Sequence, residues 1–245
     1  MNDLRLGTSM IFMESPEPRL VPNQPMDNSQ KELAVEFVEE LKSLGVLKAA
    51  AEHNVKLENN FPLCLVPKPG QPGQYMYIDN GARGGQNEKC VADPCFMTSP
   101  DHILPKLYRN GWSATLDMSK YFHLFLTARE ERKFLGLIHP GTEELHFYDK
   151  LPMGTCNSPG ASGRFGAAFL RIILRDCPLF QGTPINNTKV AMVNDSSYRP
   201  ELGEGKVLIG SDGLPTLIVW LHVDDIFFTW TNSIESRSWF IIYSR

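Results

Sequence analysis

The stretch LIVWLHVDDIFFTW, residues 217–230, decides the fold. The run LIVWLHV consists of residues that favour β-strands, Asp224 and Asp225 follow it, and IFFTW is a second apolar run. This order predicts two antiparallel strands joined at the acids. Two carboxylates at the tip of an apolar hairpin carry uncompensated charge unless a cation lies beside them. The stretch therefore predicts a hairpin that offers two carboxylates to a cation.

A third acid ends another predicted strand. The segment WSATLDMS, residues 112–119, is typical of a buried strand that ends at Asp117. If this strand neighbours the hairpin, Asp117 joins Asp224 and Asp225, and such a cluster of oxygen ligands suits Mg²⁺. Two Mg²⁺ ions can activate an attacking hydroxyl and stabilise a leaving phosphate, so the cluster indicates phosphoryl or nucleotidyl transfer. Taken alone, each acid is more typical of an ordinary turn.

Upstream of these acids, the sequence predicts an arm and a helix. Residues 1–28 contain four prolines and no apolar periodicity, which predicts an extended or loose N-terminal arm. Ser29 and Glu32 have the spacing of a capping box, and apolar residues then follow at helical spacing until Gly45. Those apolar residues are Leu33, Phe37, Val38, Leu41 and Leu44. We therefore expect an amphipathic helix that packs against a core.

Two further hairpins are predicted from short apolar runs around turns that contain Pro and Gly. The first pairs residues 63–66 with residues 74–78 and exposes Lys68 in its turn. The second lies within residues 133–148 and turns at Pro140 and Gly141.

A helix and an insertion are expected between the second hairpin and the acid hairpin. Ser158 is expected to cap a helix that runs to about Arg175. The polar, turn-rich residues 177–215 are expected to form a surface insertion.

The composition is that of a globular protein, with 245 residues, 42% hydrophobic and 21% charged. No run approaches the ~20 apolar residues of a membrane span, and no signal peptide is evident, so we expect an intracellular protein without membrane contact. The five cysteines include no C-x-x-C pair, which predicts free thiols. The net charge of −4 argues against nucleic-acid binding, but residues 61–175 carry three more basic than acidic residues.

Four motifs, in order, resemble the reverse transcriptases of retroelements over about residues 33–230. They are LVPKPGQPGQYMYID at 65–79, LDMSKYFH at 116–123, LPMGTCNSP at 151–159 and LHVDD at 221–225. The family shows a fingers hairpin with a basic loop, an LD-x-x-x-x-F-H strand, an LP-x-G-x-x-x-SP loop and an aromatic-x-Asp-Asp hairpin. His222 stands at the aromatic position of the last motif.

The resemblance implies a set of metal ligands and catalytic acids. Asp117 and Asp224 correspond to the two metal-binding carboxylates, and Asp225 corresponds to the adjoining acid. The backbone carbonyl of Met118 corresponds to a further metal ligand. The cofactor implied is a pair of Mg²⁺ ions.

The resemblance also implies contacts with the incoming nucleotide. Phe122 corresponds to the ring that packs against the nucleotide sugar, where it would clash with a 2′-hydroxyl and so select deoxynucleotides. Lys68 would meet the triphosphate, and Met153 and Gly154 would line the nucleotide and template pocket.

The polar run GARGGQNEK, residues 81–89, offers a contact with the template. Arg83 and Gln86 are expected to touch the template strand, on the argument that a basic loop attracts phosphates.

The fold implied is α+β, a polymerase right hand with a fingers region at residues 29–111 and a palm region at residues 112–245. The palm is expected to be an antiparallel sheet that carries the acids and is backed by helices. Because the chain ends 20 residues after Asp225, we expect the thumb to be missing. The implied activity is RNA-directed DNA synthesis with an RNA template, a DNA primer and deoxynucleoside triphosphates.

Three alternatives remain open at the level of sequence. An RNA-dependent RNA polymerase also presents separated aspartates, but it needs a small or polar residue at the position of Phe122. A catalytically silent, truncated remnant of an element would bind nucleic acid or a partner at most. A general Mg²⁺ phosphohydrolase would not require the SP-helix or the fingers hairpin.

Overall fold

The computed structural model describes residues 7–10, 12–91, 104, 111–166, 189–191, 204–209, 215–222 and 225–230. The chain forms two compact units. Unit 1 consists of Met1–Pro94 and Lys120–Ala161, and unit 2 consists of Cys95–Ser119 and Ser162–Arg245. Both units are discontinuous because the chain leaves unit 1 after Pro94 and returns to it at Lys120. They differ in this respect from the two continuous regions expected from the sequence.

In unit 1, the helix α2, Asn28–Ser43, begins at a capping box two residues upstream of the predicted one. Asp27 is the N-cap, and its carboxylate accepts a hydrogen bond from the Gln30 backbone N–H at 2.8 Å. The side-chain oxygen of Gln30 accepts from the Asp27 N–H at 3.1 Å. The predicted cap, Ser29, was wrong: it lies inside the helix, and its hydroxyl donates a hydrogen bond to the Asp27 carboxylate at 2.8 Å.

The apolar stripe and the end of α2 largely follow the prediction. Val38 and Leu41 are buried, whereas Leu44 is 43% exposed because it already lies past the last helical residue. The helix stops before Gly45, whose φ of 63° lies in the left-handed region that glycine adopts without strain.

The N-terminal segment is extended and attached to unit 1. The Asn60 amide pairs with Val21 in both directions, accepting from its backbone N–H at 2.6 Å and donating to its carbonyl at 2.8 Å. Met10 is only 2% exposed and belongs to the main core. The described part of the arm expected at residues 1–28 is therefore extended, which is one of the two expected forms, and it is attached to unit 1 and not loose. Its backbone finds partners in asparagine side chains, which leave no periodic signal in the sequence.

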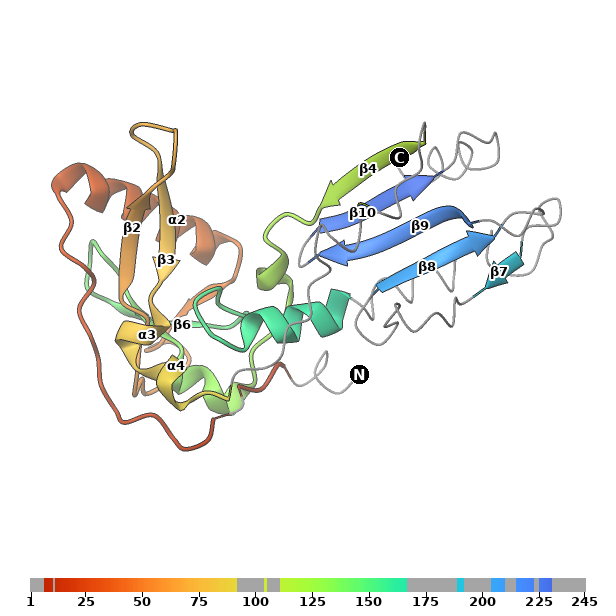
Figure 1. Cartoon of the computed structure of the whole chain (residues 1–245). Helices are drawn as coiled ribbons and strands as arrows, with labels where there is room; N and C mark the ends of the chain where they lie inside the picture. The colour runs from red at the N-terminus through yellow and green to blue at the C-terminus, as the bar shows by residue number, and fades with distance from the viewer. Residues whose placement is uncertain are drawn as a thin grey trace. The chain divides into compact units, whose positions relative to one another are not determined.

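The first predicted hairpin is confirmed as β2, Leu63–Pro67, paired antiparallel with β3, Tyr75–Asp79. In Figure 1, α2 lies beside this hairpin. The contact is made by Tyr77, whose ring stacks on Phe37 with centroids 3.9 Å apart and whose hydroxyl donates to the Leu33 carbonyl at 3.0 Å.

A second sheet in unit 1 contains β1, Leu47–Ala49, β6, Leu145–Tyr148, and β5, Gly136–Ile138, in the order β1-β6-β5. The β5 and β6 strands form the second predicted hairpin, which is confirmed. This sheet and α2 enclose the main core. Its buried members are Met10, Ala34, Val38, Leu41, Val46, Leu47, Phe61, Leu63, Leu135, Leu137, Tyr148, Leu151 and Ala161. Burying each of the larger side chains contributes roughly 1.5–3 kcal/mol.

Short helices complete the described part of unit 1. The polar run at residues 81–89 forms α3, Gly81–Gly84, and α4, Gln86–Lys89. The segment after Ser119 forms the 3₁₀ helices η2, Tyr121–Leu124, and η3, Arg129–Phe134. A further helix begins at Ser158, as predicted, and is described through residue 166; its expected end near Arg175 lies outside the described residues.

Unit 2 contains a five-stranded antiparallel sheet in the order β4-β10-β9-β8-β7 (Figure 1). The acid hairpin predicted from residues 217–230 is confirmed as β9, Pro215–His222, and β10, Asp225–Trp230. The strand β4, Trp112–Asp117, pairs with the other side of β10. An antiparallel sheet with helices elsewhere in the chain agrees with the expected α+β class.

Unit 2 differs from the expectations in two details. The segment expected to be a surface insertion, residues 177–215, contains two strands, β7, Lys189–Ala191, and β8, Glu204–Ile209, which extend the sheet. Short strands between turn residues are hard to distinguish from a loop by composition. The strand β4 was expected to be buried, but five of its six residues are exposed because it stands at one edge of the sheet.

Neither a disulfide nor a membrane span is found in the part of the chain that the structure describes. Cys64 and Cys90 are buried free thiols and Cys156 is a half-buried one, as predicted. None of the described helices combines the length and the apolar character that crossing a membrane requires.

Candidate active site: an acid pair on neighbouring strands

Two acids face each other across the β4–β10 ladder of unit 2. β4 ends at Asp117, β10 begins at Asp225, and these two residues are register partners. Directly opposed residues of an antiparallel pair point to the same face, with Cβ atoms about 4.5–5.5 Å apart. Asp117 is exposed and Asp225 is half-buried. The two carboxylates therefore lie side by side on one face at the end of the ladder.

The sequence places these acids at the end of an apolar ladder. The next register pair is Leu116 with Ile226, and Ile226 is 5% exposed. The last pair of the ladder joins Trp112 to Trp230. Apolar residues of high β propensity thus fix the pairing, and the pairing brings the acids together.

A third strand contributes to the same row of residues. Asp225 is also the register partner of His222, the last residue of β9, so the row runs from Asp117 through Asp225 to His222. Asp224 lies outside the described residues. Its approach to Asp117, and with it the complete set of three acids, therefore remains a prediction.

The acid pair is electrostatically unfavourable by itself. Like charges directly opposite each other in a sheet destabilise the pair. Within the described ranges, no lysine or arginine forms an ion pair with Asp117 or Asp225. No group of three or more His, Cys, Asp or Glu side chains in those ranges could hold a metal ion either. The described site is thus a carboxylate pair that a cation would stabilise.

Phe122 lies in unit 1, on η2. Its ring is half-buried, packs against the main core and meets Tyr121 edge to face, with centroids 6.2 Å apart. The helix η2 starts from Lys120, which has a left-handed φ of 54° and pairs with Glu40 of α2. Phe122 therefore has a structural role. Only the exposed part of its ring is accessible to a ligand.

Lys68 stands in the turn between β2 and β3, where it is exposed. The turn is closed by the Lys68 backbone N–H, which donates to the Gln74 carbonyl at 2.9 Å. Gly70 and Gly73 have φ values of 70° and 79°, which makes glycine the favourable residue at both positions. The side chain of Lys68 is thus presented to solvent at the tip of a well-defined hairpin.

Met153 and Gly154 lie in a loop that is tied to the end of β3. Met153 is 61% exposed, whereas Gly154 has no space for a side chain: a Cβ there would lie 1.9 Å from the Asp79 carbonyl oxygen. The Asn87 amide fixes the loop, donating to the Gly154 carbonyl and accepting from the Cys156 N–H, each at 3.0 Å. The close approach that Gly154 permits is to β3.

Asp79 is a residue of this region that the sequence interpretation missed. Asp79 is half-buried, and its carboxylate accepts a hydrogen bond from the Tyr148 hydroxyl at 2.7 Å. Burial raises the pKa of Asp79 to about 6, and the hydrogen bond from Tyr148 opposes this rise. The sequence feature that could have identified it is an acid at the end of the predicted strand YMYID. Asp79 contacts Gly154 and so positions the loop that carries Met153.

The two residues expected to touch the template differ in exposure. Arg83 is exposed on α3, and its carbonyl accepts a hydrogen bond from an Arg19 guanidinium nitrogen at 2.6 Å. Gln86 is fully buried, and its amide donates to the Phe134 carbonyl at 3.0 Å. A side chain with no exposed surface cannot reach a template strand, so the expected role of Gln86 was wrong.

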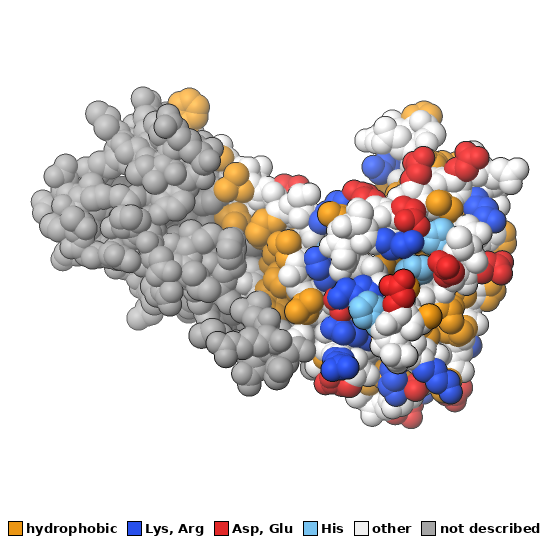
Figure 2. Space-filling model, turned by 180° about the vertical axis from the view of Figure 1, so that it is seen from behind, with side chains coloured by type: hydrophobic (Ala, Val, Ile, Leu, Met, Phe, Trp, Pro, Cys, Tyr) orange, Lys and Arg blue, Asp and Glu red, His pale blue; other side chains and the backbone are white. Residues whose placement is uncertain are grey.

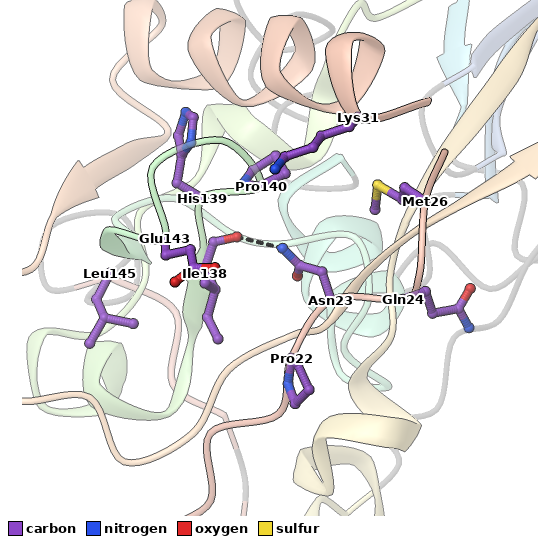
Figure 3. Close-up of a pocket in the computed structure, with 10 residues that line it drawn as sticks. All are labelled: Pro22, Asn23, Gln24, Met26, Lys31, Ile138, His139, Pro140, Glu143 and Leu145. Carbon is purple, nitrogen blue, oxygen red and sulfur yellow. Dashed lines mark hydrogen bonds between the residues drawn. The ribbon is translucent and has the colours of Figure 1, made fainter. Parts of the chain in front are cut away.

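A cavity of about 500 Å³ lies in unit 1 between the N-terminal segment, α2 and the β5–β6 turn. Figure 3 shows the Asn23 amide turned toward the Ile138 carbonyl, to which it donates at 2.8 Å. His139 is also occupied, because its Nδ1 accepts from the Gly141 and Thr142 N–H groups and its Nε2 meets Glu39. The chain itself satisfies these polar groups, which leaves few of them for a ligand.

Comparison with solved structures shows what fold this is. The structure of the foamy viral protease-reverse transcriptase in complex with RNA/DNA hybrid is similar, with a TM-score of 0.60 and 17% identity over 94% of this chain. For the native prototype foamy virus protease-reverse transcriptase, the TM-score is 0.57 and the identity is 16% over 96% of this chain. For the foamy viral complex with dsDNA, the TM-score is 0.58 and the identity is 18% over 94% of this chain. The chain has a reverse transcriptase-like fold.

The similarity is one of fold, and it covers part of those proteins. This chain spans 23%, 24% and 36% of the three foamy virus chains. No protein-family model matches the sequence, and no curated protein matches it.

Proposed function

We propose that the chain carries the nucleotidyl-transfer site of a reverse transcriptase and directs DNA synthesis on an RNA template. The observation that carries this proposal is the register pairing of Asp117 with Asp225 on neighbouring strands. The fold likeness to foamy virus reverse transcriptases supports it, since one of those structures contains an RNA/DNA hybrid. In this proposal the five-stranded sheet is the palm and the β2–β3 hairpin belongs to the fingers.

The donor set of the acid pair fits Mg²⁺. Asp117 and Asp225 offer carboxylate oxygens on one face of the sheet, and Asp224 and the Met118 carbonyl are their neighbours in sequence. Hard oxygen donors of this kind are the ligands that Mg²⁺ prefers. When two such ions are bound, they make a primer 3′-hydroxyl more acidic and neutralise the leaving pyrophosphate. The acids of the chain position these ions and hold the negative charge that attracts them.

Other residues of the chain would bind and select the nucleotide. Lys68 is exposed at the tip of its hairpin, and its ammonium suits contact with a triphosphate. The remaining exposed part of the Phe122 ring would pack against a deoxyribose and exclude a 2′-hydroxyl. Met153 and Arg83 are exposed and available to nucleotide and template respectively.

A primer-extension assay tests the proposal. The full chain, an RNA template annealed to a DNA primer, deoxynucleoside triphosphates and Mg²⁺ should give an extended primer. Asp117→Asn keeps the shape of the side chain and removes its charge, so it should lower the rate by at least about a hundredfold. Glu36→Gln, which makes the same charge change at an exposed position of α2, should leave the rate unchanged.

Three outcomes would contradict the proposal. No extension by the wild-type chain would favour the catalytically silent remnant. Faster incorporation of ribonucleotides than of deoxynucleotides would favour an RNA polymerase. An unchanged rate in Asp117→Asn would remove the acid pair from the reaction.

A further inference from the structure

A second cavity in unit 1 is lined by more basic than acidic side chains. It measures about 470 Å³ and lies between residues 53–58 and the helix η3. Its charged lining consists of Lys56, Arg129, Arg132 and Lys133 together with Glu58 and Glu130. The lining thus carries an excess of two positive charges, in a chain whose net charge is −4.

Two of these cations are held in place by acids of the chain. Lys133 pairs with Glu58 at 3.0 Å. Arg132 pairs with the buried Asp149 at 2.7 Å through one terminal nitrogen, and Lys48 pairs with the other oxygen of Asp149 at 2.6 Å. The Nε atom of Arg132 is buried and has no hydrogen-bond acceptor among the described residues. Asp149 therefore positions Arg132, whose side chain is partly exposed where it lines the cavity.

The other two cations remain available. Lys56 and Arg129 are exposed, and neither forms an ion pair with a carboxylate of the described residues. In the part of the molecule that Figure 2 draws in colour, acidic and basic side chains are interspersed on the face shown. Lys56 and Arg129 therefore leave positive charge at this cavity that attracts an anion.

The chemistry of the lining favours a phosphate. Guanidinium groups bind phosphate and carboxylate with two parallel hydrogen bonds, and two arginines lie at this cavity. A phosphate monoester carries about −1.5 to −2 charges at neutral pH, which matches the excess of two, whereas a carboxylate carries one.

The size of the cavity and an aromatic side chain at it indicate which kind of molecule bears the phosphate group. A cavity of about 470 Å³ falls within the range of roughly 300–1,000 Å³ that small-molecule ligands occupy, so it exceeds the needs of a phosphate ion. His53 is exposed at the cavity and meets Phe147 edge to face at 5.7 Å. Imidazole rings are among the side chains on which nucleic-acid bases stack.

We propose that this cavity binds a nucleotide through its phosphate monoester, which Lys56, Arg129 and Arg132 contact. The site belongs to unit 1 and uses none of the acids of unit 2. It goes beyond the proposed polymerase function and does not depend on it.

Isothermal titration calorimetry on the full chain tests this proposal. The buffer is of low ionic strength and contains EDTA, so that a Mg²⁺-dependent site at the acid pair does not contribute. The probes are adenosine 5′-monophosphate, adenosine and inorganic phosphate. We expect saturable binding of the monophosphate, weaker binding of phosphate and no binding of adenosine.

Charge variants locate the site. Lys56→Gln and Arg129→Gln should each weaken binding of the monophosphate by about tenfold, since each removes a charged hydrogen-bond donor. Glu130→Gln should strengthen binding because it removes a repelling charge. Lys31→Gln changes an exposed lysine that lines the other cavity and should have no effect. All four side chains are exposed, and thermal unfolding checks that each variant folds.

Several results would overturn the proposal. Equal binding of adenosine would exclude phosphate recognition, and equal binding of inorganic phosphate would exclude a nucleotide. Equal weakening by Lys31→Gln would show non-specific attraction. An acidic peptide that displaces the monophosphate at the same concentration would indicate a protein partner.

Discussion

Replacing Asp117 by asparagine should have opposite effects on stability with and without Mg²⁺. Asp117 and Asp225 are register partners on β4 and β10. Like charges in this position cost about 0.2–1 kcal/mol, so in EDTA the Asp117→Asn chain should be more stable than wild type by that amount. The amide keeps the shape of the side chain, and the strand pairing does not depend on its charge.

Mg²⁺ should reverse this order. An ion that binds only the folded wild-type chain adds about 1.4 kcal/mol to its free energy of unfolding when its concentration is ten times Kd. The variant loses a ligand and most of this gain. In saturating Mg²⁺ the wild-type chain should therefore be the more stable of the two.

Tryptophan fluorescence during urea denaturation is the right measurement. All four tryptophans belong to unit 2, and Trp112 and Trp230 pair at the far end of the ladder that carries the acids. The signal thus reports on the sheet in question. Glu36→Gln, on α2 of unit 1, controls for general effects of charge and should change the free energy of unfolding by less than about 0.5 kcal/mol in either buffer. A variant less stable than wild type in EDTA, or an equal gain from Mg²⁺ in both chains, would refute the reasoning.

Three further predictions concern unit 1. Gly154→Ala should destabilise the chain by about 1–3 kcal/mol, since its Cβ would collide with the Asp79 backbone; an unchanged melting temperature would contradict the contact. The raised pKa of Asp79, about 6, means that the folded state binds its proton more tightly than the unfolded state, so the free energy of unfolding should fall as pH rises from about 4 through 6, by no more than about 3 kcal/mol. In Asp79→Asn this fall should be absent, so the free energies of unfolding of the two chains should change differently between about pH 4 and 6. Identical pH profiles of the two chains would contradict the assignment. Phe122→Ala should lower the melting temperature, because the ring packs on the core, and should also raise the ratio of ribonucleotide to deoxynucleotide incorporation; a lower melting temperature with an unchanged ratio would leave Phe122 with a structural role only.

The elements of the fold were predictable where apolar patterns and turn residues coincide. The β2–β3, β5–β6 and β9–β10 hairpins all follow from β-favouring runs around Pro, Gly or acidic turns. The attachment of the N-terminal segment was not predictable in this way. Part of it comes from the amides of Asn59 and Asn60, which pair with Glu17 and Val21, and isolated buried amides leave no pattern in the sequence.

The site was predictable in part because its acidic residues lie at the ends of apolar strands, where the sequence pattern can locate them. Asp117 was expected to meet the acids of the hairpin, and the register that places it opposite Asp225 follows from apolar pairs such as Leu116 with Ile226. Gln86 shows the limit of such reasoning, because a polar residue in a polar run proved to be fully buried. Burial of a lone polar side chain depends on contacts distant in sequence, here the Phe134 carbonyl.

The most direct test of the central claim is single-turnover incorporation of one deoxynucleotide on an RNA template by four chains. These are the wild type, Asp117→Asn, Asp225→Asn and the double variant. If the two carboxylates act together as one metal site, each single change should remove most of the activity, and the double variant should be no slower than the slower single variant. Losses that multiply in the double variant, or a wild-type rate in either single variant, would contradict the claim that this pair forms the catalytic metal site.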